Sequence, residues 1–473
     1  MPVDYDLVIL GGSAIARYAA ARAAQTYARV ALVEPASTPT LQFPSYRQTL
    51  IQTAAIAQQM RQASLWGLGD AAVSLNWQET IALASGVSES LQVQGVAGQS
   101  LELLAAAGVD VVVGQGEFRS QPLGLSVGGR VLRSRRYLLA PAAQPLIPAI
   151  EGLASINYLT LETLWQQSEL PDRLIILGGN PQGVELAQAL NRLGVQVTWV
   201  SGDRLLPQED PETVALLQIQ LQTEGLHLLP QSQVQQVRQV GDSLEVITDR
   251  QRLSADAVLL ATTPQLDLTL LNLAAIGVRW QPQGVAVDRQ LRTRNKQVYA
   301  CGEALGGYPL FSLARYEAEV ALHNALFLPT AKVNYRHTPI ALFTQPECVR
   351  IGLTEAAAKQ RFREAPVVLR QFSKTLAKAQ LQNETTGFCK LIVRQNGEIL
   401  GAQWVGAGAS EGIGTIALAI QQRISVKAIA QLPILSPTAA ELLQETAQQW
   451  QQQRLTQRQG WLETWFSLRR DWF

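Results

Sequence analysis

Twice along this chain, a short apolar run ends in glycines and leads into a stretch rich in small apolar residues. The first copy covers residues 5–24, YDLVILGGSAIARYAAARAA, and the second begins at residue 173 and continues to 204. An apolar run bounded by glycines and followed by helical periodicity predicts a strand, a tight turn and a helix. A further apolar run follows each helix and ends at Glu34 in one copy and Ser201 in the other. The pattern predicts two βαβ units in an α/β chain.

The glycine turn of the first unit has the spacing of a dinucleotide-binding fingerprint, GxGxxG. Ala16 in the third place still permits close helix–strand packing, whereas Ser13 puts a Cβ where bare backbone should approach a pyrophosphate. The Ser13 hydroxyl is a candidate phosphate contact, and Glu34 is placed for a ribose hydroxyl. Taken alone, the motif fits an ordinary βα turn equally well. The motif is typical of a site for the adenosine end of FAD or NAD, and its predicted positions are Gly11, Gly12, Ser13, Ala14, Ala16 and Glu34.

The second turn keeps the same fingerprint in a weaker form. Asn180 stands in the second glycine place, and asparagine tolerates positive φ better than most residues. Ser201 ends the next strand without a carboxylate for a ribose diol, and Asp203 comes two residues late. The sequence therefore does not choose between NADH and NADPH, and weak nicotinamide binding is expected. The candidate NAD(P) positions are Gly178, Gly179, Asn180, Gly183, Glu185 and Ser201.

Length and composition narrow the class of protein. A chain of 473 residues can hold about three domains of ~150 residues. The net charge is +1 and only 16% of residues are charged, so nucleic acid is not an expected partner. Three cysteines favour a reducing compartment, and we expect neither a signal peptide nor a transmembrane helix. A cytoplasmic protein is predicted, with peripheral membrane contact as the alternative.

Landmarks from end to end make the chain resemble a known family. RLIILGGNPQGVELAQAL is followed by RTRNKQVYACGEALGG at 292–307, TPIALFTQPECVRIGLTE at 338–355 and TTGFCKLIVRQNGEILGAQWVG at 385–406. In this order they resemble the pyridine nucleotide-disulfide oxidoreductases, the family of glutathione reductase, dihydrolipoamide dehydrogenase and mercuric reductase. The resemblance implies a FAD-dependent oxidoreductase that uses NAD(P)H and forms a homodimer. It also implies flavin contacts at Gly302 and Glu303, where the family usually has Asp in place of Glu.

The resemblance implies two Rossmann-like dinucleotide-binding domains plus an α+β C-terminal dimerisation domain. In the C-terminal domain the strands CKLIVR and ILGAQWV should alternate with the helix GTIALAIQQR. The expected divisions are a FAD-binding domain at 1–155 and 266–332, a NAD(P)-binding-type domain at 156–265, an interface domain at 333–449 and a tail at 450–473.

The family's reactive groups are missing. No cysteine precedes Cys301, so the redox pair after the first unit is absent. The family's active-site lysine falls on Arg47 or Gln48, and the resemblance pairs it with Glu185 beneath the flavin N5. Arg47 would preserve the charge arrangement and Gln48 would leave only a hydrogen bond. Near the C-terminus, Ser436 stands for the catalytic histidine and Glu441 for its orienting carboxylate; serine cannot do acid–base work near neutral pH.

The remaining thiols and imidazoles stand singly. Cys301, Cys348 and Cys389 are too far apart for a CxxC or CxxxxC pair, and we interpret them as small buried hydrophobic residues. The three histidines have no ligand partners nearby in sequence, so no metal site is predicted.

The last 24 residues carry an aromatic stripe. Trp461, Trp465, Leu468 and Trp472 recur at helical spacing, with arginines on other sides. Such a helix packs back on its own protein or dimer mate, which is the favoured interpretation, or lies on a membrane surface where a quinone would be found.

Three functions stay open on these observations. The first is a FAD enzyme that oxidises NAD(P)H and passes electrons to a quinone or another small acceptor, with no disulfide or mercuric reductase activity. The second is a flavoprotein without nicotinamide turnover that exchanges electrons with a protein or a quinone. The third is a non-catalytic dimeric scaffold.

Overall fold

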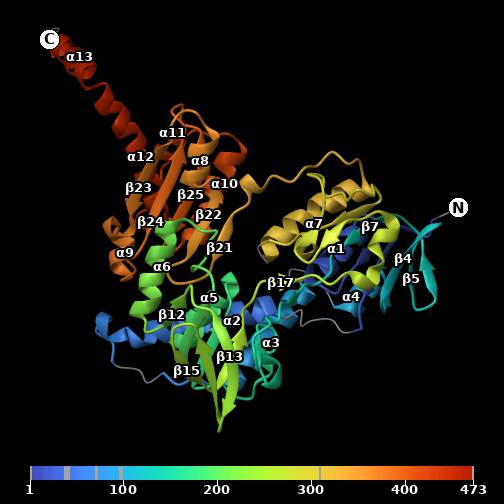
Figure 1. Ribbon diagram of the computed structural model, residues 1–473. Helices are drawn as coiled ribbons and strands as arrows, with labels where there is room; N and C mark the ends of the chain where they lie inside the picture. Colours follow the sequence, from blue (N-terminus) through green and yellow to red (C-terminus); the bar gives the residue numbers. More distant parts are fainter. Residues whose placement is uncertain (1–2, 37–42, 70–72, 95–99, 308–309, 471–473) are drawn as a thin grey trace. The chain divides into compact units, whose positions relative to one another are not determined.

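The computed structural model describes residues 3–36, 43–69, 73–94, 100–307 and 310–470 (Figure 1). The chain divides into two compact units, which are treated separately below. Unit 1 comprises residues 1–205 and 224–333, and unit 2 comprises residues 206–223 and 334–473.

The first sheet of unit 1 is parallel and buried on both faces. Its strand order is β20-β7-β1-β2-β3, and the apolar residues of the central strand alternate between two cores. Leu7 and Ile9 pack with helices α1 and α7, while Val8 and Leu10 pack with an antiparallel meander, β4 to β6. The elements are β1 (Tyr5–Leu10), α1 (Ala14–Ala24), β2 (Val30–Glu34), α4 (Leu101–Ala106), β3 (Asp110–Val113), β4 (Gly116–Ser120), β5 (Leu123–Val127), β6 (Arg130–Leu132), β7 (Ser134–Leu139), β20 (Val298–Ala300) and α7 (Phe311–Leu326).

A second parallel sheet in unit 1 repeats this plan, in the order β12-β11-β10-β16-β9. Ile175 and Leu177 of its central strand face a second meander, β13 to β15. The elements are α2 (Phe43–Arg61), α3 (Trp77–Val93), β9 (Leu159–Thr160), β10 (Arg173–Leu177), α5 (Pro181–Arg192), β11 (Gln196–Ser201), β12 (His227–Pro230), β13 (Val234–Val240), β14 (Ser243–Thr248), β15 (Arg252–Ala255) and β16 (Ala257–Leu260). Two small ladders, β8 (Gln144–Pro145) with β17 (Pro264–Gln265) and β18 (Trp280–Gln281) with β19 (Gly284–Val285), complete the unit.

Unit 2 is an antiparallel sheet in the order β21-β22-β25-β24-β23, with helices packed on it. Trp404 is fully buried against α10, where a Cβ on Gly412 would come within 2.3 Å of the indole ring. Glycine at this position therefore lets the helix approach the sheet. The elements are α6 (Pro211–Thr223), β21 (Ile340–Leu342), β22 (Cys348–Gly352), α8 (Glu355–Arg361), β23 (Val367–Phe372), α9 (Ala377–Leu381), β24 (Phe388–Val393), β25 (Ile399–Val405), α10 (Ala409–Gln421), α11 (Val426–Ala430), α12 (Ala440–Gln457) and α13 (Gln459–Arg470).

Two expected boundaries differ from the compact units of the structure. Residues 206–223, which we expected within 156–265, group with the C-terminal residues instead. Within this unit, Lys390 Nζ lies 2.9 Å from Asp210 and 3.1 Å from Glu212. The expected boundary at 449/450 falls inside α12, and Trp450 belongs to the buried core of unit 2.

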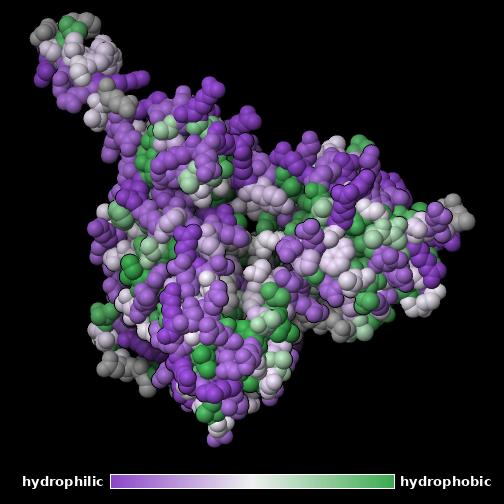
Figure 2. All heavy atoms as spheres, viewed as in Figure 1, coloured by the Kyte–Doolittle hydropathy of each residue, from purple (hydrophilic) through white to green (hydrophobic). Residues whose placement is uncertain are grey.

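The C-terminal helix α13 is the most exposed element of unit 2. None of its described residues is buried, so the expectation that it packs back on its own chain is wrong for them. Figure 2 shows hydrophobic and hydrophilic atoms side by side at this end. Contact with a dimer mate or a membrane stays a prediction. No helix among the described residues is long and apolar enough to span a membrane.

The Lys390 contacts predict the effect of a substitution. Lys390→Met leaves the carboxylate of Asp210 buried without its cation, so we expect the free energy of unfolding to fall by about 3–5 kcal/mol. Lys359→Met is the matched control, because Lys359 pairs with Glu355 on the exposed surface of α8 and its loss costs less than about 0.5 kcal/mol. Urea denaturation measures both, and equal effects would contradict the role given to Lys390.

Candidate functional site

The first glycine turn is shaped by a close backbone approach. Gly11 has φ +143°, and a Cβ there would lie 2.0 Å from the carbonyl oxygen of Ala140. Only glycine fits such a position, so the strand β1 can end against the segment that follows β7. Gly178 repeats this geometry after β10, with φ +127° and 2.2 Å to the carbonyl oxygen of Ala261.

Ser13 is the N-cap of α1 and its hydroxyl is engaged within the protein. Its Oγ accepts a hydrogen bond from the Ala16 amide at 3.1 Å and donates one to the Ala140 carbonyl at 2.7 Å. The hydroxyl is therefore not the phosphate contact that we considered from the sequence. The amides of Ser13, Ala14 and Ile15 have no acceptor among the described residues, and they form an open helix N-terminus that favours an anion.

The carboxylate of Glu34 is held at the end of β2 by a residue that sequence reasoning missed. Arg17, on the first turns of α1, donates from Nε and Nη2 to the two carboxylate oxygens at 2.9 and 2.6 Å. The bidentate pair fixes the carboxylate in place.

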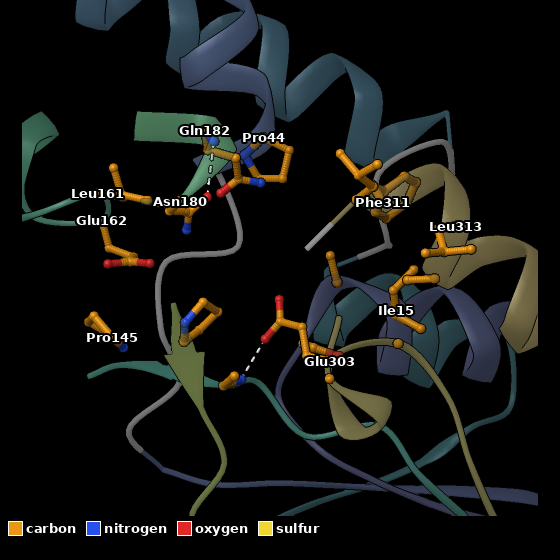
Figure 3. A pocket seen from close by; sticks show the side chains of 18 of the residues that line it. Ile15, Pro44, Pro145, Leu161, Glu162, Asn180, Gln182, Glu303, Phe311 and Leu313 are labelled. Carbon is orange, nitrogen blue, oxygen red and sulfur yellow. Dashed lines mark hydrogen bonds between the residues drawn. The ribbon is translucent and has the colours of Figure 1, made fainter. Parts of the chain in front are cut away.

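A pocket in unit 1 brings the start of α1 together with several other predicted positions (Figure 3). Its walls come from helices and loops around the two sheets, together with Leu260 at the end of β16. They include Ser13, Ala14, Ile15, Pro44, Arg47, Ala143, Glu162, Asn180, Gln182, Thr262, Gly302, Glu303, Phe311 and Glu317. Gly12, Gly179 and Ser201 are not among the lining residues.

Arg47, rather than Gln48, faces Glu185. The guanidinium of Arg47 on α2 donates to the carboxylate of Glu185 on α5, with 8% and 1% of the two side chains exposed. A buried pair of this kind is stable only while both partners are present, because either charge alone is costly to bury. The sequence left these two positions open, and the structure shows which one meets the acid.

A short 3₁₀ helix, η6 (Gly302–Leu305), lines another wall of the pocket. Gly302 has φ +66° and donates its amide to Glu317 at 2.8 Å. Glu303 accepts from the Ala143 amide, as the dashed line in Figure 3 shows. Burial raises the pKa of Glu303 to about 6; the Ala143 amide opposes this shift and the charge of Glu162 adds to it. The pocket therefore holds a carboxyl group that titrates near neutral pH.

The start of α5 differs from that of α1. Asn180 is the N-cap, and its side-chain oxygen accepts from the Gln182 amide at 3.0 Å (Figure 3). Pro181 occupies the first helical position and has no N–H. At the end of β11, the Ser201 hydroxyl accepts from the Asp203 amide at 3.2 Å and is turned to local structure.

Comparison with known proteins shows which family this chain belongs to. Residues 5–318 match the family model of the pyridine nucleotide-disulphide oxidoreductases, and residues 338–447 match the dimerisation domain of the same family. The chain belongs to this family. The match confirms both the resemblance seen in the sequence and the predicted fold class, and its dimerisation domain supports a homodimer.

The relatives carry different activities. A mercuric reductase of Streptomyces lividans is 31% identical over 462 residues, which cover 94% of this chain and 96% of that protein. One of Staphylococcus aureus is 29% identical, covering 90% and 78%. A dihydrolipoyl dehydrogenase of Bacillus subtilis is 28% identical, covering 93% and 97%. The structure of LpdA from Mycobacterium tuberculosis superposes with a TM-score of 0.84 at 24% identity, covering 94% and 99%, and shows the same fold.

The three thiols of this family member are free and buried. Cys301 lies in unit 1, whereas Cys348 and Cys389 lie in unit 2 on strands separated by β25. Burial raises the pKa of Cys348 and of Cys389 to about 12, and it raises that of Cys301 further. All three are protonated at neutral pH, so none is a ready nucleophile.

The C-terminal positions are also engaged elsewhere. Ser436 is exposed, and Glu441 accepts a hydrogen bond from the Thr438 amide at 2.9 Å. Glu441 thus takes part in the N-terminal turn of α12. Among the described residues, no group of three or more His, Cys, Asp or Glu could hold a metal ion.

Sequence reasoning missed four residues around the pocket: Arg17, Ala143, Pro181 and Glu317. Only Pro181 gave a usable signal, because a proline directly after a turn motif removes an amide donor. The others act through contacts with residues that are 15 to 160 positions away.

The raised pKa of Glu303 predicts a pH-dependent stability of the FAD-free protein. The pKa of Glu303 rises from its ordinary value of 4.5 to about 6 in the folded protein. The protonated carboxyl group therefore contributes fully to the free energy of unfolding below pH 4.5, and this contribution is lost as pH rises through 6. Glu303→Gln should have the same free energy of unfolding as the parent protein at pH 4, and a free energy higher by at most about 2 kcal/mol at pH 7. Denaturation at both pH values measures this. A difference between variant and parent that is the same at both would refute it.

Proposed function

We propose that this chain is a FAD-dependent oxidoreductase whose flavin passes electrons to a non-disulfide acceptor, a quinone or another small molecule. The observation that carries the proposal is the pocket lined by the open start of α1, the η6 wall and Arg47, whose guanidinium is paired with Glu185. A bound FAD would supply a two-electron carrier at this place.

The residues present fit such a cofactor. The open amides of Ser13, Ala14 and Ile15 would bind its pyrophosphate. Glu34, already oriented by Arg17, would accept from the adenosine ribose. Gly302 and Glu303 would contact the ribityl chain and phosphate, as the family resemblance implies.

By the family resemblance, Arg47 and Glu185 would take the place of the family's lysine–glutamate pair beneath the flavin N5. Their buried ion pair places the guanidinium of Arg47 at the pocket wall. A permanent cation stabilises negative charge on a neighbouring group but does not relay protons. Arg47 therefore acts as an electrostatic residue in this proposal.

A disulfide acceptor would need chemistry that the described thiols do not offer. Exchange requires a thiolate beside the flavin, and each of the three cysteines is buried with a raised pKa. Without a pair of thiols beside the flavin, a different electron acceptor can contact the wall of the pocket.

The first test uses the purified, FAD-loaded protein, reduced anaerobically by light in the presence of a sacrificial donor. Oxygen-free menadione should reoxidise the flavin within seconds, whereas glutathione disulfide and lipoamide should not at an ordinary enzyme rate of ~1 per second. Faster reoxidation by a disulfide would defeat the proposal. A colourless protein that does not take up FAD would support the non-catalytic scaffold instead.

Substitution of Arg47 tests its electrostatic role. Arg47→Met leaves Glu185 buried without a cation, and we expect at least a tenfold slower reoxidation by menadione together with a shifted flavin spectrum. Arg47→Lys restores the charge and should recover most of the rate. If Arg47→Met leaves spectrum and rate unchanged, Arg47 does not act near the flavin.

A further inference from the structure

The amides at the start of α5 are all engaged or missing. In any helix the first four N–H groups lack a partner within the helix, and these groups bind a phosphate. Here the Asn180 amide donates to the Ala261 carbonyl at 3.0 Å, and Pro181 has none. The Gln182 amide donates to the Asn180 side chain, and the Gly183 amide to the Asn180 carbonyl at 2.9 Å. The amides of Asn180, Gln182 and Gly183 therefore donate within the protein and are not available to the pyrophosphate of a dinucleotide.

The equivalent turn in the same unit is the internal control. At the start of α1, the amides of Ser13, Ala14 and Ile15 have no acceptor in the described chain, and only that of Ala16 is capped. Both turns have the same glycine close to the carbonyl of the neighbouring strand, so they share one template. They differ in whether the helix start is left open.

We infer that the second dinucleotide-binding fold of this protein does not hold a nicotinamide dinucleotide by its pyrophosphate. Ser201 adds to this, because its hydroxyl serves the Asp203 amide and no carboxylate stands at that strand end for a ribose. The inference rests on the proposed flavin function and means that NADH and NADPH do not reduce this flavin through the second turn.

Anaerobic titration of the FAD-loaded protein tests the closed turn. NADH or NADPH at 1 mM should not bleach the flavin within minutes, while dithionite, which needs no dinucleotide site, should. Asn180→Gly combined with Pro181→Ala returns two open amides to α5 and should lower the NADH concentration for half-reduction at least tenfold. Pro211→Ala, which adds an amide at the start of α6, is the matched control and should change nothing.

The outcomes separate this inference from the function that it rests on. Bleaching of the parent by micromolar NADH overturns the closed turn and leaves the flavin function intact. A double variant whose NADH concentration for half-reduction does not fall also overturns the closed turn, because the closure was assigned to Asn180 and Pro181. A protein that binds no FAD contradicts the proposed function itself. Retention of FAD by the double variant, seen in its visible spectrum, shows that it is folded.

A second inference comes independently from α13. Its apolar side chains are exposed, with 64% of Trp461, 46% of Trp465 and 54% of Leu468 open to solvent. The two indole rings stack with centroids 6.0 Å apart, which makes one continuous aromatic face. Residues 450–470 carry four arginines against one acid, Glu463. Tryptophan and arginine together suit the boundary between lipid headgroups and acyl chains.

We propose that α13 docks on an anionic lipid surface. The aromatic face would enter the headgroup region, and Arg469 and Arg470 at the end of the helix would meet lipid phosphates. The partner is a membrane, because the excess positive charge complements anionic headgroups.

Flotation of the full chain with vesicles tests the docking. The protein should float with vesicles of 30% phosphatidylglycerol and should not float with pure phosphatidylcholine. Trp461→Ser with Trp465→Ser should lower the bound fraction at least tenfold, whereas Trp66→Ser, at an exposed tryptophan in unit 1, should not. Absence of flotation in the parent overturns the proposal. So does loss of the dimer in the double variant, which would assign the face to the partner subunit.

Discussion

The amides at the start of a buried helix must find acceptors, and this requirement decides what the protein can bind. Two turns with the same glycine geometry meet it differently. The start of α1 leaves the amides of Ser13, Ala14 and Ile15 without an acceptor among the described residues, whereas at the start of α5 each amide donates within the protein or, at Pro181, is absent. We propose that only the first helix start receives an anion from outside. Family membership alone would have given both turns the same role.

Much of the fold could be predicted because it depends on local sequence patterns. Strand, glycine turn and helix recur twice within unit 1 with the residues in their expected places, and Glu34 and Ser201 end the strands that the pattern predicts. The strands and helix expected in the C-terminal domain are present as β24, β25 and α10. These features depend on periodicity and on backbone geometry that only glycine adopts, and both are visible in a single sequence.

The parts that could not be predicted depend on pairs far apart in sequence. The sequence left Arg47 and Gln48 as alternatives for the partner of Glu185, because one residue along α2 changes the side of the helix that faces α5. Lys390 binds Asp210 from 180 positions away, and residues 206–223 belong to the C-terminal unit. The hydroxyl of Ser13 looked free for a phosphate until the structure showed that it caps its own helix. Contacts of this kind have no signature in periodicity or spacing.

The central claim is that electrons in this protein pass through the flavin alone, without a thiol pair. An anaerobic titration of the FAD-loaded protein with dithionite counts those electrons directly. A flavin takes up two electrons and a redox-active disulfide two more. We predict complete reduction at about two electrons per FAD, with no further uptake. An end point near four electrons per FAD would show a redox-active disulfide and would contradict the account.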